Sequence, residues 1–338
     1  MKKLSILFAL LILLASLSAC GLKSETAFDR TGTTCANAVM SQGKFAWSND
    51  FIYINAGGEF YEFDLTTGTA VKLTEENMYW PRSLFATDRY LYWVGRGTET
   101  DEEGRTTDCL QYMTKDGKKS NVFWNSGDSC YYLYAEGTEL FYTTGVGGAL
   151  CCQKLPADDE EMPEPTVLLP CINQYYVDDN YIYAVIPANA EENIPENYLV
   201  RSPRQAINFE KIELSFPPAA VMADGDDLYI ASQKPFQLTR WQEGTETQLP
   251  IRSVYYQVLN SEIIYLDDET LNQGTFTLKS YDLQTGEICP LLEGVYDFCI
   301  LENRYICAQC AGEKAARYLC LDRQSGQLVT MLDEGERE

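Results

Sequence analysis

A short alternation of polar and apolar residues recurs seven times along this chain of 338 residues. Each copy begins with polar or small residues typical of a turn and continues with an apolar pair that usually ends in tyrosine. The copies span residues 49–53, 88–92, 137–142, 179–183, 225–229, 260–265 and 303–307. They recur every 36 to 50 residues, with a mean of about 42, which is the period of a β-propeller blade.

A second segment follows each copy and reads as two strands joined by a turn. Its clearest examples carry Asp-x-x-Thr/Ser-Gly at 64–68, 282–286 and 322–326. In such a turn the Asp side chain can accept hydrogen bonds from backbone amides, and the Gly supplies a positive φ. An alternating segment, such as 83–87, precedes each tyrosine copy. Every unit therefore provides four short antiparallel strands.

These units predict an all-β fold: a seven-bladed β-propeller of four-stranded antiparallel blades, preceded by a lipoprotein signal peptide. One twisted sheet cannot bury both of its faces, whereas blades packed face to face around an axis bury them all. The 23 Tyr and 5 Trp residues supply large side chains for these contacts. We expect blades at about 43–74, 83–125, 130–169, 173–214, 218–250, 253–292 and 296–332, with a tail at 333–338.

The first twenty residues read as a processing signal. Two lysines precede an apolar run at 4–15 that is shorter than a membrane-spanning helix. The run leads to Leu-Ser-Ala-Cys-Gly, with the cysteine at Cys20, and this sequence resembles the lipobox of bacterial lipoproteins. The resemblance implies a signal peptide at 1–19, diacylation of Cys20 and a lipidated N-terminus and tether at 20–42. An ordinary secretory signal with a chance cysteine is the alternative.

Composition excludes several classes of function. Fifty acidic and 26 basic residues give a formal charge of −24, which repels nucleic acid and anionic head groups. Acidic runs such as 99–103 are typical of a solvated surface, and binding of a cationic partner is the alternative. The chain has no histidine, which excludes Ser-His-Asp and Cys-His catalysis and histidine metal ligands. G-x-S-x-G and Walker sequences are also missing, so we expect no catalytic residues, cofactor or metal.

Twelve cysteines need an explanation. Apart from Cys20, eleven remain, so at least one is unpaired within the chain, and most are expected to be small buried hydrophobes. Cys307 and Cys310 form a C-x-x-C, but on a strand a separation of three places their side chains on opposite faces. If 313–314 is a two-residue turn, Cys307 lies opposite Cys320, and this pair is the candidate disulfide.

Two of the tyrosine copies carry a resemblance to a known family. Phe51-Ile-Tyr-Ile-Asn55 and Leu91-Tyr-Trp-Val94 resemble the YWTN propellers of low-density-lipoprotein-receptor-related proteins. They are more similar still to bacterial lipoproteins that carry a domain of unknown function of this type, in which a Gly-Asn-Thr-like segment comparable to 32–37 precedes the first blade. The resemblance covers roughly 29–332 and implies six to eight blades, with no implied activity. Blades 3 and 4 depart from it, since 150–154 and 199–203 replace the usual Asp-Gly turn.

Loop lengths and aromatic residues indicate one face of the expected propeller as the site of function. Long loops at 95–108, 187–197 and 267–275 open on the face where the innermost strands begin, and long loops commonly carry function. Aromatic residues start the innermost strand in five blades, and alternation would turn one of each pair toward the axis. There, a ring of Tyr and Trp could stack on sugars or hold a peptide, with Arg252 and Asp297 as further polar candidates. The candidate ligand-binding residues are Tyr79, Trp80, Arg82, Tyr132, Tyr176, Tyr256 and Tyr296, and packing between blades is the alternative role of the aromatics.

We therefore expect a non-catalytic binding or scaffolding propeller, located outside the cytoplasm and anchored to a bacterial cell membrane. Its ligand would be a glycan, a peptide or a protein partner on the long-loop face, and its second contact would be the lipid bilayer through Cys20. The alternative is a carbohydrate-active propeller enzyme that uses Asp or Glu in the axial channel.

Overall fold

The computed structural model describes most of the chain after residue 33. The described residues are 34–40, 43–74, 81–87, 89–100, 106–117, 120–125, 130–144, 147–154, 163–189, 194–259, 261–272 and 274–336. They form an all-β structure with one short helix, α2 (Cys35–Met40), and a terminal 3₁₀ turn, η1 (Glu334–Glu336). Among these residues, no helix has the length and apolar character needed to cross a bilayer. The signal peptide and Cys20 lie outside the described residues.

Five antiparallel sheets have four strands each, paired in sequence order. Sheet 1 contains β1 (Phe45–Ser48), β2 (Phe51–Ala56), β3 (Glu59–Asp64) and β4 (Thr69–Lys72). Sheet 2 contains β5 (Arg82–Ala86), β6 (Tyr90–Thr100), β7 (Thr106–Thr114) and β8 (Ser120–Asn125). Sheet 3 contains β9 (Tyr131–Glu136), β10 (Glu139–Thr143), β11 (Leu150–Lys154) and β12 (Thr166–Leu169). Sheet 4 contains β13 (Gln174–Val177), β14 (Tyr181–Ile186), β15 (Tyr198–Pro203) and β16 (Glu210–Ile212). Sheet 5 contains β17 (Pro218–Asp224), β18 (Asp227–Ser232), β19 (Gln237–Gln242) and β20 (Thr245–Arg252).

The sixth sheet has seven strands because one long strand serves two neighbours. It contains β21 (Tyr256–Leu259), β22 (Glu262–Asn272), β23 (Thr275–Asp282), β24 (Ile288–Leu301), β25 (Tyr305–Ala311), β26 (Ala316–Asp322) and β27 (Leu328–Asp333). The first half of β24 pairs with β23, and from Val295 onward β24 pairs with β25. The seven strands therefore correspond to two four-stranded sheets that have β24 in common.

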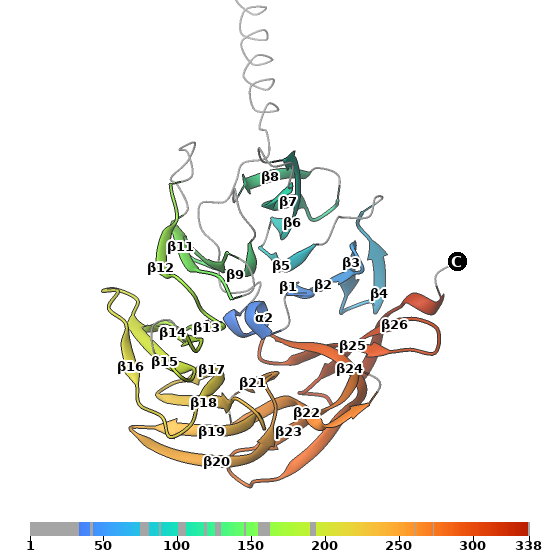
Figure 1. The fold of residues 1–338 in the computed structure, drawn as a ribbon. Helices are drawn as coiled ribbons and strands as arrows, with labels where there is room; N and C mark the ends of the chain where they lie inside the picture. Colours follow the sequence, from blue (N-terminus) through green and yellow to red (C-terminus); the bar gives the residue numbers. More distant parts are fainter. Residues whose placement is uncertain are drawn as a thin grey trace, which may run out of the picture.

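The sheets are arranged around a centre that holds α2, with β1, β5, β9, β13, β17, β21 and β24 nearest to it (Figure 1). We call the end of the ring at which these inner strands begin the loop face. The opposite end is the turn face, because tight turns there lead into the second strands. The described residues of all seven tyrosine copies lie at these turns and at the starts of the second strands, which confirms their expected place in the fold.

The Asp-x-x-Thr-Gly turns form as their residues predict. The Asp64 carboxylate accepts hydrogen bonds from the backbone amides of Thr66 at 2.7 Å and Thr67 at 3.2 Å. These bonds stabilise the charged form and lower the pKa of Asp64. Gly68 has a φ of 69°, a conformation that side chains with a Cβ adopt at a cost.

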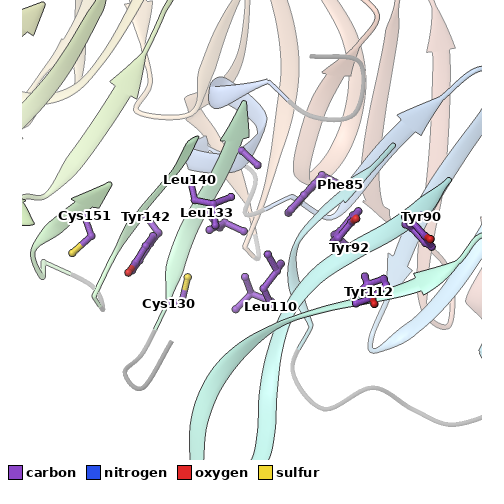
Figure 2. Packing of buried hydrophobic residues seen from close by; sticks show 12 residues of the cluster. Phe85, Tyr90, Tyr92, Leu110, Tyr112, Cys130, Leu133, Leu140, Tyr142 and Cys151 are labelled. Atoms are coloured by element: carbon purple, nitrogen blue, oxygen red, sulfur yellow. The ribbon is translucent and has the colours of Figure 1, made fainter. Parts of the chain in front are cut away.

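Packing between neighbouring sheets buries most of the apolar side chains. Figure 2 shows the contact of sheets 2 and 3, where Phe85, Tyr92 and Tyr112 face Leu133 and Tyr142. Six further clusters repeat this pattern around the ring, and one of them joins sheet 1 to β24–β27. Each buried aromatic side chain contributes about 2 to 3 kcal/mol through removal of apolar surface from water. Tyrosines of the second strands are therefore part of the core.

Candidate ligand site at the loop face

Arg82 lies at the start of β5 and fixes the contact between sheets 2 and 3. Its guanidinium donates to the carbonyl of Cys130 at 3.1 Å and to the carboxylate of Asp108. The guanidinium carbon also lies 4.0 Å from the centre of the Tyr131 ring, in a cation–π contact. Because Arg82 is largely buried and its charge is paired, its role is to hold Tyr131 at the start of β9.

Tyrosines from different sheets stand at the starts of the inner strands. We call the end of the ring's centre at these strand starts the loop-face mouth. The rings of Tyr131 and Tyr132 are 6.2 Å apart and both side chains are half-buried. Burial raises the pKa of the Tyr132 hydroxyl, and the neighbouring hydroxyls of Tyr255 and Tyr131 raise it further. Tyr255 precedes β21, and Tyr132 is on β9, so both stand at the starts of inner strands on the loop face. Tyr255 is 45 % exposed and Tyr296, on β24, is 44 % exposed, so both offer an aromatic surface to solvent.

The structure assigns different positions to two other expected mouth residues. Tyr256 is fully buried between sheets, and its hydroxyl donates to the carbonyl of Tyr229 at 2.6 Å. Its preceding neighbour Tyr255 takes the surface position, because alternation along β21 turns Tyr256 into the core. Tyr176 packs into the clusters around β13, and burial raises its pKa strongly. Tyr79 and Trp80 lie outside the described residues.

Asp297 follows Tyr296 and forms a partly buried polar contact with Lys44, the side chains being 18% and 33% exposed. Its carboxylate lies 3.7 Å from the ammonium of Lys44 and accepts a hydrogen bond from the Phe298 amide at 2.8 Å. Lys44 also donates to the side chain of Gln309. Burial raises the pKa of Asp297 to about 7, and Lys44 partly offsets this rise. The contact joins the start of sheet 1 to the strands of the last sheet.

Helix α2 lies at the centre of the ring (Figure 1). Residues 35–39 are buried, although the sequence analysis places them in a tether. Thr34 caps the helix, since its hydroxyl accepts the amide of Asn37 at 3.2 Å. The Asn37 side chain exchanges two hydrogen bonds with the backbone of Ile300, at 2.8 and 3.1 Å. The Val177 amide donates to the Cys35 sulfur at 3.2 Å. A ligand at the mouth would therefore rest on a closed centre.

The course of α2 also gives the chain a direction through the ring. Cys35 contacts Val177, the last residue of β13, which places it toward the turn face. Lys44 contacts Asp297 near the start of the inner half of β24, toward the loop face. From Cys35 to Lys44 the described residues thus run from the turn-face side toward the loop face, where β1 begins.

Among the described residues, three cavities lie away from the inner-strand tyrosines; one, of about 600 Å³, is at the β25–β26 turn, and the other two have walls from neighbouring sheets, which sequence patterns do not predict. One, of about 480 Å³, opens on the loop face between sheets 4 and 5 and is lined by residues that include Tyr198, Phe216 and Pro218. The other, of about 370 Å³, opens on the turn face beside Arg204. Arg204 donates to Glu136 at 2.7 Å and Glu139 at 2.8 Å, so its charge is already paired.

The described residues contain no group of three or more Cys, Asp or Glu side chains arranged to hold a metal ion. Cys307 lies directly opposite Cys320, as the expected hairpin requires, and both are free cysteines in the structure. The candidate disulfide therefore has the right register but remains a prediction.

Comparisons of structure support a β-propeller. The chain is similar to the β-propeller domain of the Trilobed protease from Pyrococcus furiosus, described as having an open velcro topology, with 12% identity and a TM-score of 0.59 over 93% of this chain and 100% of that chain. It is similar to tricorn protease, with 12% identity and a TM-score of 0.60 over 88% of this chain and 35% of that chain, so it spans about a third of that protein. A putative 6-phosphogluconolactonase from Bacteroides uniformis matches with 14% identity and a TM-score of 0.51, over 86% of this chain and 93% of that chain.

At these identities the likeness shows the fold alone. Neither a protein-family model nor a curated protein matches the sequence. The fold defines the class: the chain is a β-propeller of antiparallel sheets, which confirms the expected all-β architecture.

Proposed function

We propose that this protein is a seven-bladed, non-catalytic binding propeller, anchored by lipid outside the cytoplasm, and that its ligand surface is the loop-face mouth. Seven buried clusters between neighbouring units support the blade number, with β24 belonging to two blades. The leader sequence and Cys20 support the anchor.

The observation that carries the binding role is the exposure of Tyr255 and Tyr296 at the loop-face starts of β21 and of the inner half of β24, with the half-buried Tyr131 and Tyr132 at the start of β9. Exposed aromatic rings at the rim of a rigid ring offer flat surfaces at a small cost in conformational entropy. Nearby cations are paired within the protein, including Arg82 with Asp108. A neutral glycan, which stacks on aromatic rings and needs no counter-charge, fits this surface best.

A binding screen tests the proposal. The soluble form lacking residues 1–20 is applied to glycan and peptide arrays, and the affinity of the best ligand is measured by calorimetry. Tyr255→Ala and Tyr296→Ala should each weaken a glycan about 5- to 10-fold, the value of one stacking contact of about 1 kcal/mol. Ile207→Ala is the matched control, because Ile207 is exposed beside the turn-face cavity.

If all three variants bind the ligand with equal affinity, the loop-face mouth is not the ligand site. Binding of peptides alone would replace the glycan with a protein partner, and release of shorter sugars from a bound glycan would contradict the non-catalytic assignment.

A further inference from the structure

Three cysteines form a ladder across the last sheet. Cys299 on β24 lies directly opposite Cys307 on β25, and Cys307 lies directly opposite Cys320 on β26. All three are buried, with exposed fractions of 0 to 1%. Side chains directly opposite each other on neighbouring antiparallel strands have Cβ atoms about 4.5 to 5.5 Å apart, so the thiol of Cys307 has a cysteine neighbour on each side. The central cysteine therefore has two candidate partners, one on each neighbouring strand.

The hydrogen-bond pattern of the sheet distinguishes the two pairs. The Arg323 amide donates to the carbonyl of Arg304 at 3.0 Å, which identifies this pair as hydrogen-bonded. Hydrogen-bonded and non-hydrogen-bonded pairs alternate along an antiparallel ladder. Three positions further along β25, Cys307 and Cys320 therefore form a non-hydrogen-bonded pair.

The same alternation makes Cys299 and Cys307 a hydrogen-bonded pair, because the N–H and C=O of Cys307 point toward β24. Directly opposite side chains approach more closely in non-hydrogen-bonded pairs. A disulfide needs Cβ atoms about 3.5 to 4.5 Å apart. The geometry of the sheet therefore favours the Cys307–Cys320 pair over the Cys299–Cys307 pair.

The ladder lies where the ring closes. Its side chains belong to the cluster that joins the last sheet to sheet 1, where they pack with Phe45, Ile54 and Phe63. No strand among the described residues is shared between sheet 1 and the last sheet. Burial raises the pKa of Cys299 and Cys307, and the neighbouring Cys307 thiol together with burial raises the pKa of Cys320; the thiolate is the species that attacks disulfides. A disulfide formed here would resist exchange.

We propose that Cys307 and Cys320 form a structural disulfide in the exported protein, while Cys299 remains a thiol beside it. Two thiols give up two protons and two electrons to an external disulfide, which is reduced to two thiols as the bond between the two Sγ atoms forms. The proposal rests on export to an oxidising compartment, and its chemical step is independent of any ligand at the mouth.

Peptide mapping of the full-length protein tests the proposal. The protein is purified from membranes in detergent, alkylated under denaturing conditions before and after reduction, digested and analysed by mass spectrometry. We expect a linked peptide that contains Cys307 and Cys320, with Cys299 alkylated before reduction. A link between Cys299 and Cys307, or alkylation of all three before reduction, would overturn the proposal.

Thermal unfolding supplies a second measurement. Reduction should lower the melting temperature of the wild type by about 5 °C, the effect expected for closing a short loop in a domain of this size. Cys320→Ala should show no such shift. Cys310→Ala is the matched control, because Cys310 lies on β25 but packs in a different cluster, and this variant should keep the wild-type shift. The same link should form when purified reduced protein is oxidised with glutathione disulfide.

Discussion

Asp297 is a partly buried carboxyl group at the junction of the first and last strands of the ring, and its pKa is raised to about 7 by burial. In the unfolded chain the same group titrates near pH 4. Between these values the folded protein holds a proton that the unfolded chain releases. The contribution of Asp297 to stability is therefore complete below about pH 4 and is lost as the pH rises through 7.

Asp297→Asn should remove this dependence. From pH 5 to pH 8 the wild type should lose about 2 to 3 kcal/mol of unfolding free energy relative to the variant, since each pH unit is worth up to about 1.4 kcal/mol. Urea denaturation of both proteins at several pH values measures the difference. Asp64→Asn is the control, because the pKa of Asp64 is lowered and its contribution changes only in acid. Parallel curves for wild type and Asp297→Asn would contradict the prediction.

Neighbouring tyrosines show what sequence could and could not predict at this scale. Alternation predicts that one member of each pair faces the core, as with Tyr255 outside and Tyr256 inside. Alternation does not determine which member of a pair is buried, because a strand of four residues gives no other sign of which of its faces points into the core. The pair Tyr131 and Tyr132 breaks the rule: both are half-buried, and Tyr132 has a φ of 51° beside a register shift.

Among the elements, α2 combines a small size with many contacts. Its six residues reach strands β9, β13 and β24, and Asn37 satisfies both the amide and the carbonyl of Ile300. A buried backbone group without a partner costs about 1 to 3 kcal/mol. The helix therefore stabilises the centre through hydrogen bonds as well as apolar packing.

Asn37→Ala should reduce the unfolding free energy by about 2 to 4 kcal/mol, because it leaves two polar groups of β24 unpaired. Chemical denaturation measures the loss, and hydrogen exchange should show faster exchange at Ile300. Asn208→Ala, at an exposed loop position, serves as the control and should change stability by less than about 0.5 kcal/mol. A loss for Asn37→Ala no larger than that of the control would show that the helix contributes only packing.

Repetition explains why the second strands were predictable and α2 was not. Each tyrosine copy combines turn residues with β-forming residues, and seven instances reinforce one another. The sequence of α2, Cys-Ala-Asn-Ala-Val-Met, occurs once and is shorter than the windows in which helical periodicity can be recognised. Its conformation depends on the channel around it, and that channel exists only after the blades assemble.

At the scale of the whole molecule, the ring closes by side-chain contacts. Sheet 1 uses only strands β1–β4, and the last strands pair among themselves through β27. The described residues at the seam are joined by an apolar cluster, the Lys44–Asp297 contact and the Asn37–Ile300 bonds. Closure therefore depends on packing, on these polar contacts and on the centrally placed helix.

The path of α2 predicts an orientation for the anchored protein. Because Cys35 lies toward the turn face, the lipid proposed at Cys20 should hold that face toward the bilayer. Two exposed native cysteines report on the faces: Cys171 contacts the loop-face Gly147, and Cys289 is near the turn-face end of β24. In Cys289→Ser and Cys171→Ser variants on vesicles, a fluorophore on Cys289 should be quenched by head-group quenchers at least about twofold more than one on Cys171.

Equal quenching, or stronger quenching at Cys171, would contradict this orientation. Cys20→Ala provides the control for the anchor itself, since this variant should stay in the supernatant when the vesicles are sedimented.

The central position of α2 also determines how a mechanical force on the N-terminus is distributed among the sheets. Tension on the N-terminus acts first on α2, whose bonds to Val177 and Ile300 lie on different sheets. The force is thus divided among several inner strands at once, whereas a chain attached to an outer strand would peel one sheet away bond by bond. If the proposed lipid anchor at Cys20 holds the protein, the central helix places the point where force enters the fold near the axis of the ring.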